Sequence, residues 1–176
     1  NSFVVGVSGG PDSLALASIT KSIAIEKKYK FFFALVDHGL RKNSNKEALS
    51  VKKLLKKQNL TLSILKNKQK ITKNIQKNAR DIRYELLGKF CKKKNAKSLL
   101  VAHHQDDQIE TFLIRLSRGS GVEGLSSMQE MITLKNGTRL IRPLLDFKKI
   151  DLIKIAENIF GKTLKDPSNK NKKFFN

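Results

Sequence analysis

The chain has almost nothing with which to cross-link itself or to bind a soft metal. Its 176 residues include one cysteine, Cys91. A single cysteine excludes an internal disulfide and a CxxC redox or zinc pair, so we expect Cys91 to serve packing alone. The chain also lacks an apolar run long enough to cross a bilayer and a charged-then-apolar leader. These absences predict a cytoplasmic protein with no membrane segment.

Acidic residues are scarce, with 15 Asp and Glu against 36 Lys and Arg, for a net charge of +21. Such an excess favours a polyanion partner such as RNA, because basic side chains neutralise phosphates. A lysine-rich surface written by an AT-rich genome explains the same excess, and charge alone leaves both interpretations open. Arginine is the rarer choice, which indicates positions where a forked donor is needed. The arginines are Arg41, Arg80, Arg83, Arg115, Arg118, Arg139 and Arg142.

Two common nucleotide signatures are missing near the start of the chain. No Gly-Lys-Ser/Thr follows the glycine pair there, which excludes a Walker loop, and no GxGxxG dinucleotide fingerprint occurs. Instead, an apolar run at residues 3–7 predicts a buried strand, and the residues after Asp12 predict a helix. Gly9 and Gly10 allow a sharp turn close to a ligand, and the N–H groups that open a helix favour an anion. Residues 8–13 therefore predict either a tight turn or a phosphate cradle.

Further strands and helices alternate along the chain, separated by short loops. This alternation predicts an α/β fold of one domain, a doubly wound parallel sheet with flanking helices. Additional strands are expected at residues 31–36, 61–65 and 98–102, with helices at 45–58, 72–94 and 148–160 and one that stops at Gly119.

Local patterns predict how several of these elements begin, end and pack. Ser44 and Glu47 have the spacing of a capping box, and Asp146 can cap the last helix, which Gly161 closes. Apolar residues at three- and four-residue spacing along 72–94 predict a core stripe. Asn136-Gly137 between apolar stretches predicts a hairpin, and residues 118–125 form a glycine-rich loop.

An acidic cluster follows the predicted strand at 98–102. His103 and His104 precede Asp106, Asp107 and Glu110. The carboxylates have a purely structural interpretation, since acidic groups stabilise a helix start by about 0.3–1 kcal/mol. Zinc fits poorly without thiolates or an H-E-x-x-H spacing, whereas Mg²⁺ on a triphosphate needs only one or two carboxylates. We expect Asp12 and Asp106 to be the metal ligands, and Asp106 and Glu110 share a helix face.

The hexapeptide at residues 8–13, Ser-Gly-Gly-Pro-Asp-Ser, resembles the PP-loop of the ATP pyrophosphatases. Other segments are similar, in order and spacing, to the tRNA(Ile)-lysidine synthase family, and the resemblance covers nearly the whole chain. These segments are residues 36–41 (VDHGLR), 79–84 (ARDIRY), 102–111 (AHHQDDQIET), 118–121 (RGSG), 142–145 (RPLL) and 166–169 (DPSN).

The resemblance implies a Rossmann-like PP-loop fold and a ligase that forms a carbon–nitrogen bond. Members use ATP to adenylate the wobble cytidine of an isoleucine tRNA at its carbon-2 oxygen, and free L-lysine then displaces AMP. The implied cofactors are ATP and Mg²⁺, and the implied partners are tRNA(Ile) and lysine, with a homodimer left open. The implied ATP-binding residues are Ser8, Gly9, Gly10, Pro11, Asp12, Ser13, Asp37, His38 and Arg41. Those implied for catalysis are Asp12, Asp37, Asp106, Asp107 and Glu110, and those for tRNA phosphate or AMP are Arg80, Arg83, Arg115 and Arg118.

Members of the family carry further domains after the catalytic one. We therefore expect residues 1–176 to be a single catalytic domain from a longer protein, without its C-terminal tRNA-binding domains. Two other functions stay open. A sister PP-loop enzyme that thiolates tRNA would need more cysteines than Cys91 to carry sulfur or an iron–sulfur cluster. A non-catalytic nucleotide sensor or RNA-binding module would not need the acidic cluster.

Overall fold

A computed structural model describes residues 1–69, 71–119 and 128–161 of the chain. The predicted glycine-rich loop beyond Gly119 and the motif at residues 166–169 lie outside these ranges. The elements are β1 (Ser2–Gly6), α1 (Pro11–Lys27), β2 (Lys30–Asp37), α2 (Ser44–Lys57), β3 (Leu62–Lys66), α3 (Ile75–Lys93), β4 (Ser98–Leu100), α4 (Gln105–Ser117), β5 (Met131–Thr133), β6 (Arg139–Ile141) and α5 (Lys149–Phe160).

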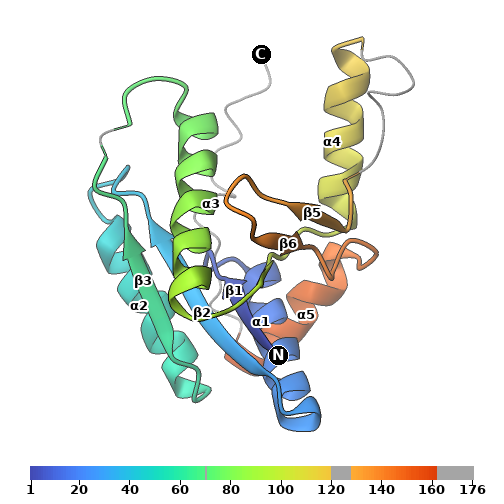
Figure 1. The fold of residues 1–176 in the computed structure, drawn as a ribbon. Coiled ribbons are helices and arrows are strands. Elements are labelled where there is room, and N and C mark those ends of the chain that lie inside the picture. The colour runs from blue at the N-terminus through green and yellow to red at the C-terminus, as the bar shows by residue number, and fades with distance from the viewer. Residues whose placement is uncertain (70, 120–127, 162–176) are drawn as a thin grey trace.

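The strands form one sheet in the order β3-β2-β1-β4-β6-β5 (Figure 1). Strands β3, β2, β1, β4 and β6 are parallel to one another, and β5 runs antiparallel to β6. The predicted parallel sheet and the hairpin are therefore confirmed. The strand order reverses direction between β1 and β4, and in open α/β sheets the ligand crevice lies outside the carboxyl ends of the strands at such a point.

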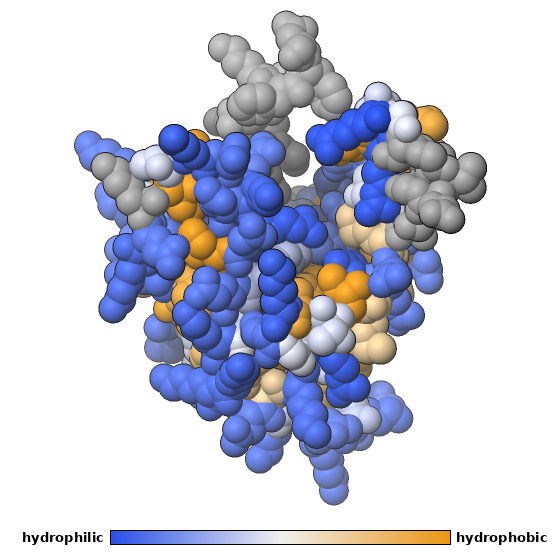
Figure 2. Space-filling view, turned by 45° about the horizontal axis from the view of Figure 1, so that its top comes forward, coloured by the Kyte–Doolittle hydropathy of each residue, from blue (hydrophilic) through white to orange (hydrophobic). Residues whose placement is uncertain are grey.

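The surface and the core differ as the composition predicts. Figure 2 is dominated by hydrophilic residues, consistent with the excess of lysine. Beneath that surface, Val4 and Val5 of β1 are fully buried, one on each face of the sheet. A strand buried on both faces lies at the centre of a sheet with helices on both sides.

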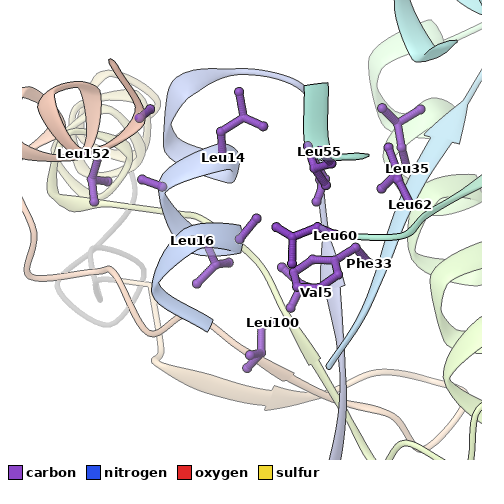
Figure 3. Close-up of a cluster of buried hydrophobic side chains, with 14 of the residues drawn as sticks. Val5, Leu14, Leu16, Phe33, Leu35, Leu55, Leu60, Leu62, Leu100 and Leu152 are labelled. Carbon is purple, nitrogen blue, oxygen red and sulfur yellow. The ribbon is translucent and has the colours of Figure 1, made fainter. Parts of the chain in front are cut away.

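Helices α1, α2 and α5 cover one face, and α3 covers the other. The larger core cluster joins Val5 and Phe33 of the sheet to Leu14 of α1, Leu55 of α2 and Leu152 of α5 (Figure 3). Across the sheet, the C-terminal half of α3 packs its own cluster, which contains Cys91. Burial raises the pKa of the Cys91 thiol to about 11, so this cysteine is a packing residue, as expected.

Three local predictions are wrong. Asn43 rather than Ser44 occupies the N-cap of α2, and no side chain caps that helix. Lys148, not Asp146, occupies the N-cap of α5. The apolar stripe of α3 is buried only towards its C-terminal end, and Ile75 is 51% exposed, because no element within the described residues covers the first turns of this helix.

Helix α4 is unlike the other helices. None of its residues is buried, and it projects away from the body of the sheet (Figure 1). Five of its large apolar side chains are exposed: Ile109, Phe112, Leu113, Ile114 and Leu116. None of the helices in the described part of the chain is long and apolar enough to cross a membrane.

Candidate active site

A cavity of about 570 Å³ lies at the carboxyl edge of the sheet. Its walls are the last residues of β1 and β2, the residues that follow β1, β2 and β4, the first residues of α1, α2, α4 and α5, and part of α3. Four helix N-termini therefore border one cavity. Each contributes unpaired N–H groups and a partial positive charge, so the arrangement favours an anionic ligand.

The loop between β1 and α1 is organised by the hydroxyl of Ser13. That oxygen accepts hydrogen bonds from the backbone N–H groups of Ser8 (3.1 Å) and Gly9 (3.2 Å), and its own proton goes to the carbonyl oxygen of Gly10 (2.9 Å). Gly9 has φ +94°, and a Cβ there would stand 2.6 Å from Cγ2 of Val51. Only glycine meets both conditions, which explains the first glycine of the motif.

Asp12 faces His104 and Asp107 at the base of the cavity. Nε2 of the buried His104 lies 3.6 Å from Oδ2 of Asp12 and 3.5 Å from Oδ2 of Asp107. Burial raises the pKa of Asp12, against the lowering effect of His104 and Lys149. Oδ1 of Asp12 is buried with no hydrogen-bond partner among the described residues. This oxygen is available to a cation or a donor brought by a ligand.

Asp37 and His38 lie at the end of the neighbouring strand β2. Asp37 is 8% exposed, and its Oδ1 accepts the N–H of Gly39 at 3.0 Å, which fixes the turn after the strand. Burial and the charge of Arg83 lower the pKa of His38, while Asp37 opposes them. His38 therefore presents a neutral imidazole to the cavity at pH 7.

His103 leads into the opposite wall. Its Nδ1 accepts a hydrogen bond from Nε of the buried Arg142 at 3.2 Å. Burial lowers the pKa of His103 to about 4, against the effect of Asp107 and helped by Arg142, Arg80 and Arg83. A neutral His103 can accept from Arg142, whereas a protonated one could not.

Three arginines act on His103, and of these Arg83 lines the cavity. The guanidinium carbons of Arg80 and Arg83 lie 5.4 and 5.2 Å from the centre of the Tyr84 ring. Arg142 is buried, and desolvation lowers its pKa. Stacking on an aromatic ring holds a guanidinium in place without neutralising it, so these groups can still bind an anion.

The structure divides the predicted site residues into two groups. The cavity is lined by Ser8, Asp12, Ser13, Asp37, His38, Arg41, Arg83 and Asp107. The others do not line it. Gly9, Gly10 and Pro11 shape the turn that opens α1, Arg80 lies on α3 behind Arg83, and Asp106, Glu110, Arg115 and Arg118 lie on the exposed helix α4 or directly after it.

The two predicted metal ligands, Asp12 and Asp106, lie in different surroundings. No group of three or more His, Cys, Asp or Glu side chains within residues 1–69, 71–119 and 128–161 is arranged to hold a metal ion. Asp106 is exposed, whereas Asp107 lines the cavity beside Asp12. The unpartnered Oδ1 of Asp12 fits a Mg²⁺ ion that takes one carboxylate from the protein and its other oxygens from phosphates and water.

Sequence patterns did not single out three residues that line or support the site. Lys149 lines the cavity but lies 137 positions after Asp12, so no local motif connects the two. The sequence places His104 only beside the acidic cluster and gives it no role, although its buried ring lies near two carboxylates, those of Asp12 and Asp107. Arg142 appears in the sequence analysis among the seven arginines and within the motif at residues 142–145, but its hydrogen bond to His103 spans 39 positions and follows from neither. The preference for Arg over Lys in a lysine-rich chain was the signal for Arg142.

The sequence of the chain matches a protein family and several curated proteins. The model of the PP-loop domain family matches residues 1–176. A tRNA(Ile)-lysidine synthase of Wolbachia pipientis wMel is 46% identical over 177 residues, covering 99% of this chain and 41% of that protein. The synthase of Novosphingobium aromaticivorans is 34% identical, covering 94% of this chain and 50% of its own length. The chain thus spans half or less of the length of these curated relatives.

Among solved structures, the chain resembles the U34-tRNA thiolase of Methanococcus maripaludis with its 4Fe–4S cluster. The TM-score is 0.72 and the sequence identity 18%, and the match covers 89% of this chain and 55% of the thiolase. At this sequence identity, the likeness shows a shared fold and nothing more.

Proposed function

The chain belongs to the PP-loop domain family, and from this premise we propose that the protein ligates L-lysine to the wobble cytidine of an isoleucine tRNA at the expense of ATP. In the first step the carbon-2 oxygen of the cytidine attacks the α-phosphate of ATP, and pyrophosphate leaves. In the second, the amine of lysine attacks carbon 2, the carbon–oxygen bond breaks, and AMP leaves. The amine gives up a proton in the process.

One observation carries the proposal. Residues 8–13, 36–41 and 102–111, whose combined resemblance is specific to the lysidine synthases, all contribute to the lining of one cavity although they lie far apart in the sequence. The curated relatives at 46% and 34% identity support the same activity over the part that they share with this chain.

We assign the phosphates of ATP to the N–H groups at the start of α1. The turn of Gly9 and Gly10 exposes them, and Pro11 and the Ser13 hydroxyl hold the loop in shape. Asp12 would hold a Mg²⁺ ion, which neutralises charge on the phosphates when bound. Asp37, His38 and Arg41, which follow β2, line the nucleoside side of the cavity.

We assign Asp107 to the lysine substrate. Its carboxylate lines the cavity, and an anion there both attracts the lysine ammonium and can accept its proton, which the attacking amine must lose. Asp106 and Glu110 are exposed residues near the start of the same helix, α4, and we keep them as predicted contacts for lysine or metal. Arg83 and Arg80, stacked on Tyr84, are placed to receive AMP or a tRNA phosphate.

We assign tRNA binding in part to the basic surface. Arg115 and Arg118 lie towards the exposed end of α4, and the whole chain carries a net charge of +21. Phosphate contacts release counterions, so the affinity for tRNA is expected to fall steeply as salt is added. If the affinity for tRNA did not change with salt, the excess of basic residues would be attributed to an AT-rich genome instead.

We further propose a cytoplasmic homodimer in which residues 1–176 are the catalytic domain. A second copy fits the exposed apolar face of α4, where Ile109, Phe112, Leu113 and Leu116 recur at three- and four-residue spacing. Sedimentation of the whole protein tests this assembly. Leu113→Asp is expected to give monomers, and an unchanged mass would remove α4 from the interface.

A thiolase is the second candidate because the fold matches a tRNA thiolase. Sulfur transfer needs accessible thiolates, but Cys91 is buried on α3 outside the cavity, and its thiol stays protonated at pH 7. The residues present therefore favour lysine ligation.

Incubation of the whole protein with ATP, labelled lysine and purified isoleucine tRNAs tests the proposal. We expect label only in the tRNA with a wobble cytidine, with AMP and pyrophosphate formed in equal amounts. The matched control is the same tRNA with uridine at that position, which should stay unlabelled. ADP and phosphate as products would overturn the proposal.

A further inference from the structure

The cavity contains one cationic side chain to which no sequence motif assigns a role. Lys149, the first residue of α5, lines the cavity together with Asp12 and Ser13, and its charge acts on Asp12. It is half-buried, and within the described ranges its ammonium has no ion pair and no hydrogen bond. The Lys149 charge lowers the pKa of the Asp12 carboxylate, but no salt bridge within those ranges holds the ammonium, so a ligand can contact it.

Packing fixes the position of Lys149 relative to the loop. Leu152 and Ala156 lie on the same face of α5 as Lys149, are fully buried, and belong to the core cluster of Leu14 and Leu16 on α1 (Figure 3). Helices α1 and α5 therefore bring their N-termini to the cavity as one rigid unit. The chain before α5 is tied to α4 as well, since the N–H of Gln105 donates to the carbonyl oxygen of Phe147 at 3.1 Å.

Three cationic side chains line the cavity, Lys149, Arg83 and Arg41, and the first two act at different places. The charge of Lys149 lowers the pKa of Asp12, whereas the charge of Arg83 lowers the pKa of His38 and His103. Lys149 thus serves the end of the cavity at the start of α1, and Arg83 serves the end near β2 and α3. The start of α1 is the end where the phosphates of ATP are assigned.

We propose that Lys149 binds the β- and γ-phosphates of ATP and the pyrophosphate that leaves. The loop at residues 8–13 lacks the lysine that follows the glycines of a Walker loop and reaches the same phosphates. Lys149 supplies that charge from a helix more than 130 positions further along the chain. This inference rests on the proposed function, because it takes ATP as the ligand of the cavity.

Calorimetric titration of the whole protein with ATP, AMP and inorganic pyrophosphate tests the assignment. Lys149→Met is expected to weaken ATP and pyrophosphate binding by about tenfold to a hundredfold, the usual loss for a charge-assisted contact, and to leave AMP binding unchanged. Lys149→Arg keeps the charge and should recover most of the affinity. Lys148→Met is the matched control, because Lys148 is exposed and does not line the cavity, and it should bind all three as the wild type does.

Two results would overturn the role of Lys149. One is a Lys149→Met variant that binds ATP and pyrophosphate normally, and the other is an equal loss of AMP binding. Equal melting temperatures of the Met and Arg variants check that the fold is intact. If ATP binding follows the expected pattern but no lysine enters tRNA, the proposed function fails while the role of Lys149 stands.

Discussion

Helices α1 and α4 begin at the same cavity and are held in opposite ways. Each has an acidic residue in its first turn that faces His104, Asp12 in α1 and Asp107 in α4. Over its whole length, α1 is a core helix with seven buried residues, whereas α4 has none. The core holds the body of α1, whereas α4 is anchored to the described part of the chain around its first turn.

This difference suggests a division of labour. The start of α1 is a rigid cradle, because moving it would disturb Leu14 and the core behind it. The start of α4 is anchored locally by the N–H of His104, which donates to Oδ2 of Asp107 at 2.9 Å, and by the pairing of His104 with Leu144. The rest of α4 is left to contact a partner or a substrate.

Truncation of one leucine on each helix tests whether the core stabilises α1 and not α4. Leu14 is fully buried, so Leu14→Ala is expected to lower the free energy of unfolding by about 3–5 kcal/mol. Leu113 is 55% exposed in the single chain, so Leu113→Ala should change the free energy of unfolding of the monomer by less than about 0.5 kcal/mol. Urea titrations of both variants, at protein concentrations low enough to keep the protein monomeric, measure the difference. Equal losses in the monomer would mean that α4 is covered by another part of the same chain, whereas a loss for Leu113→Ala that grows with protein concentration would point to the second copy.

The free energy of unfolding is expected to depend on pH through His103, which lies just before the start of α4. Burial holds the pKa of folded His103 at about 4, against 6.5 in the unfolded chain, so unfolding takes up a proton between these values. The stability due to neutral His103 is complete above pH 6.5 and is lost as the pH falls towards 4, by at most about 3 kcal/mol.

Stability curves of the wild type and of His103→Gln at pH 4 to 8 check this effect. The variant is expected to lose less stability towards acid than the wild type. Parallel curves would show that His103 titrates normally in the folded state.

A smaller effect is expected at the cradle itself. Gly9→Ala combines an unfavourable φ with a close contact to Val51, so the loop should shift, with a loss of about 1–3 kcal/mol in stability and weaker ATP binding. Gly137→Ala is the matched control, since Gly137 also has a positive φ, +81°, but no atom lies within 4 Å of an added Cβ. Melting temperature and ATP affinity of both variants separate the contact from the backbone strain. If both lose ATP affinity equally, the close approach of Val51 is irrelevant to the cradle.

The sequence predicted what depends on neighbouring residues. The strand, glycine turn and helix at residues 3–27 follow from apolar runs and from φ requirements, and the sheet follows from the alternation of elements. The partnership of Asp12 with His104 and Lys149 did not follow, because it depends on how α4 and α5 dock against α1.

Burial was harder to predict than periodicity. The stripes of α3 and α4 look alike in sequence, yet the C-terminal half of α3 is core and α4 is exposed, because only α3 lies over the sheet. The cap predictions failed for a similar reason. Ser44 and Asp146 suit an N-cap chemically, but the chain enters each helix one residue earlier or two residues later than their positions require.

The most direct test of the account is AMP formation by Asp12→Asn in the complete reaction with tRNA, ATP and lysine. We expect the rate to fall at least about a hundredfold while the melting temperature rises. The rise follows because burial raises the pKa of Asp12. Its stabilising contribution is complete only below its unfolded value near 3.8 and is lost as the pH rises through the folded value, so the ionised carboxylate is a burden at pH 7 that asparagine removes. A lower melting temperature would contradict the raised pKa of Asp12, and undiminished AMP formation would contradict the placement of Asp12 at the reacting phosphates.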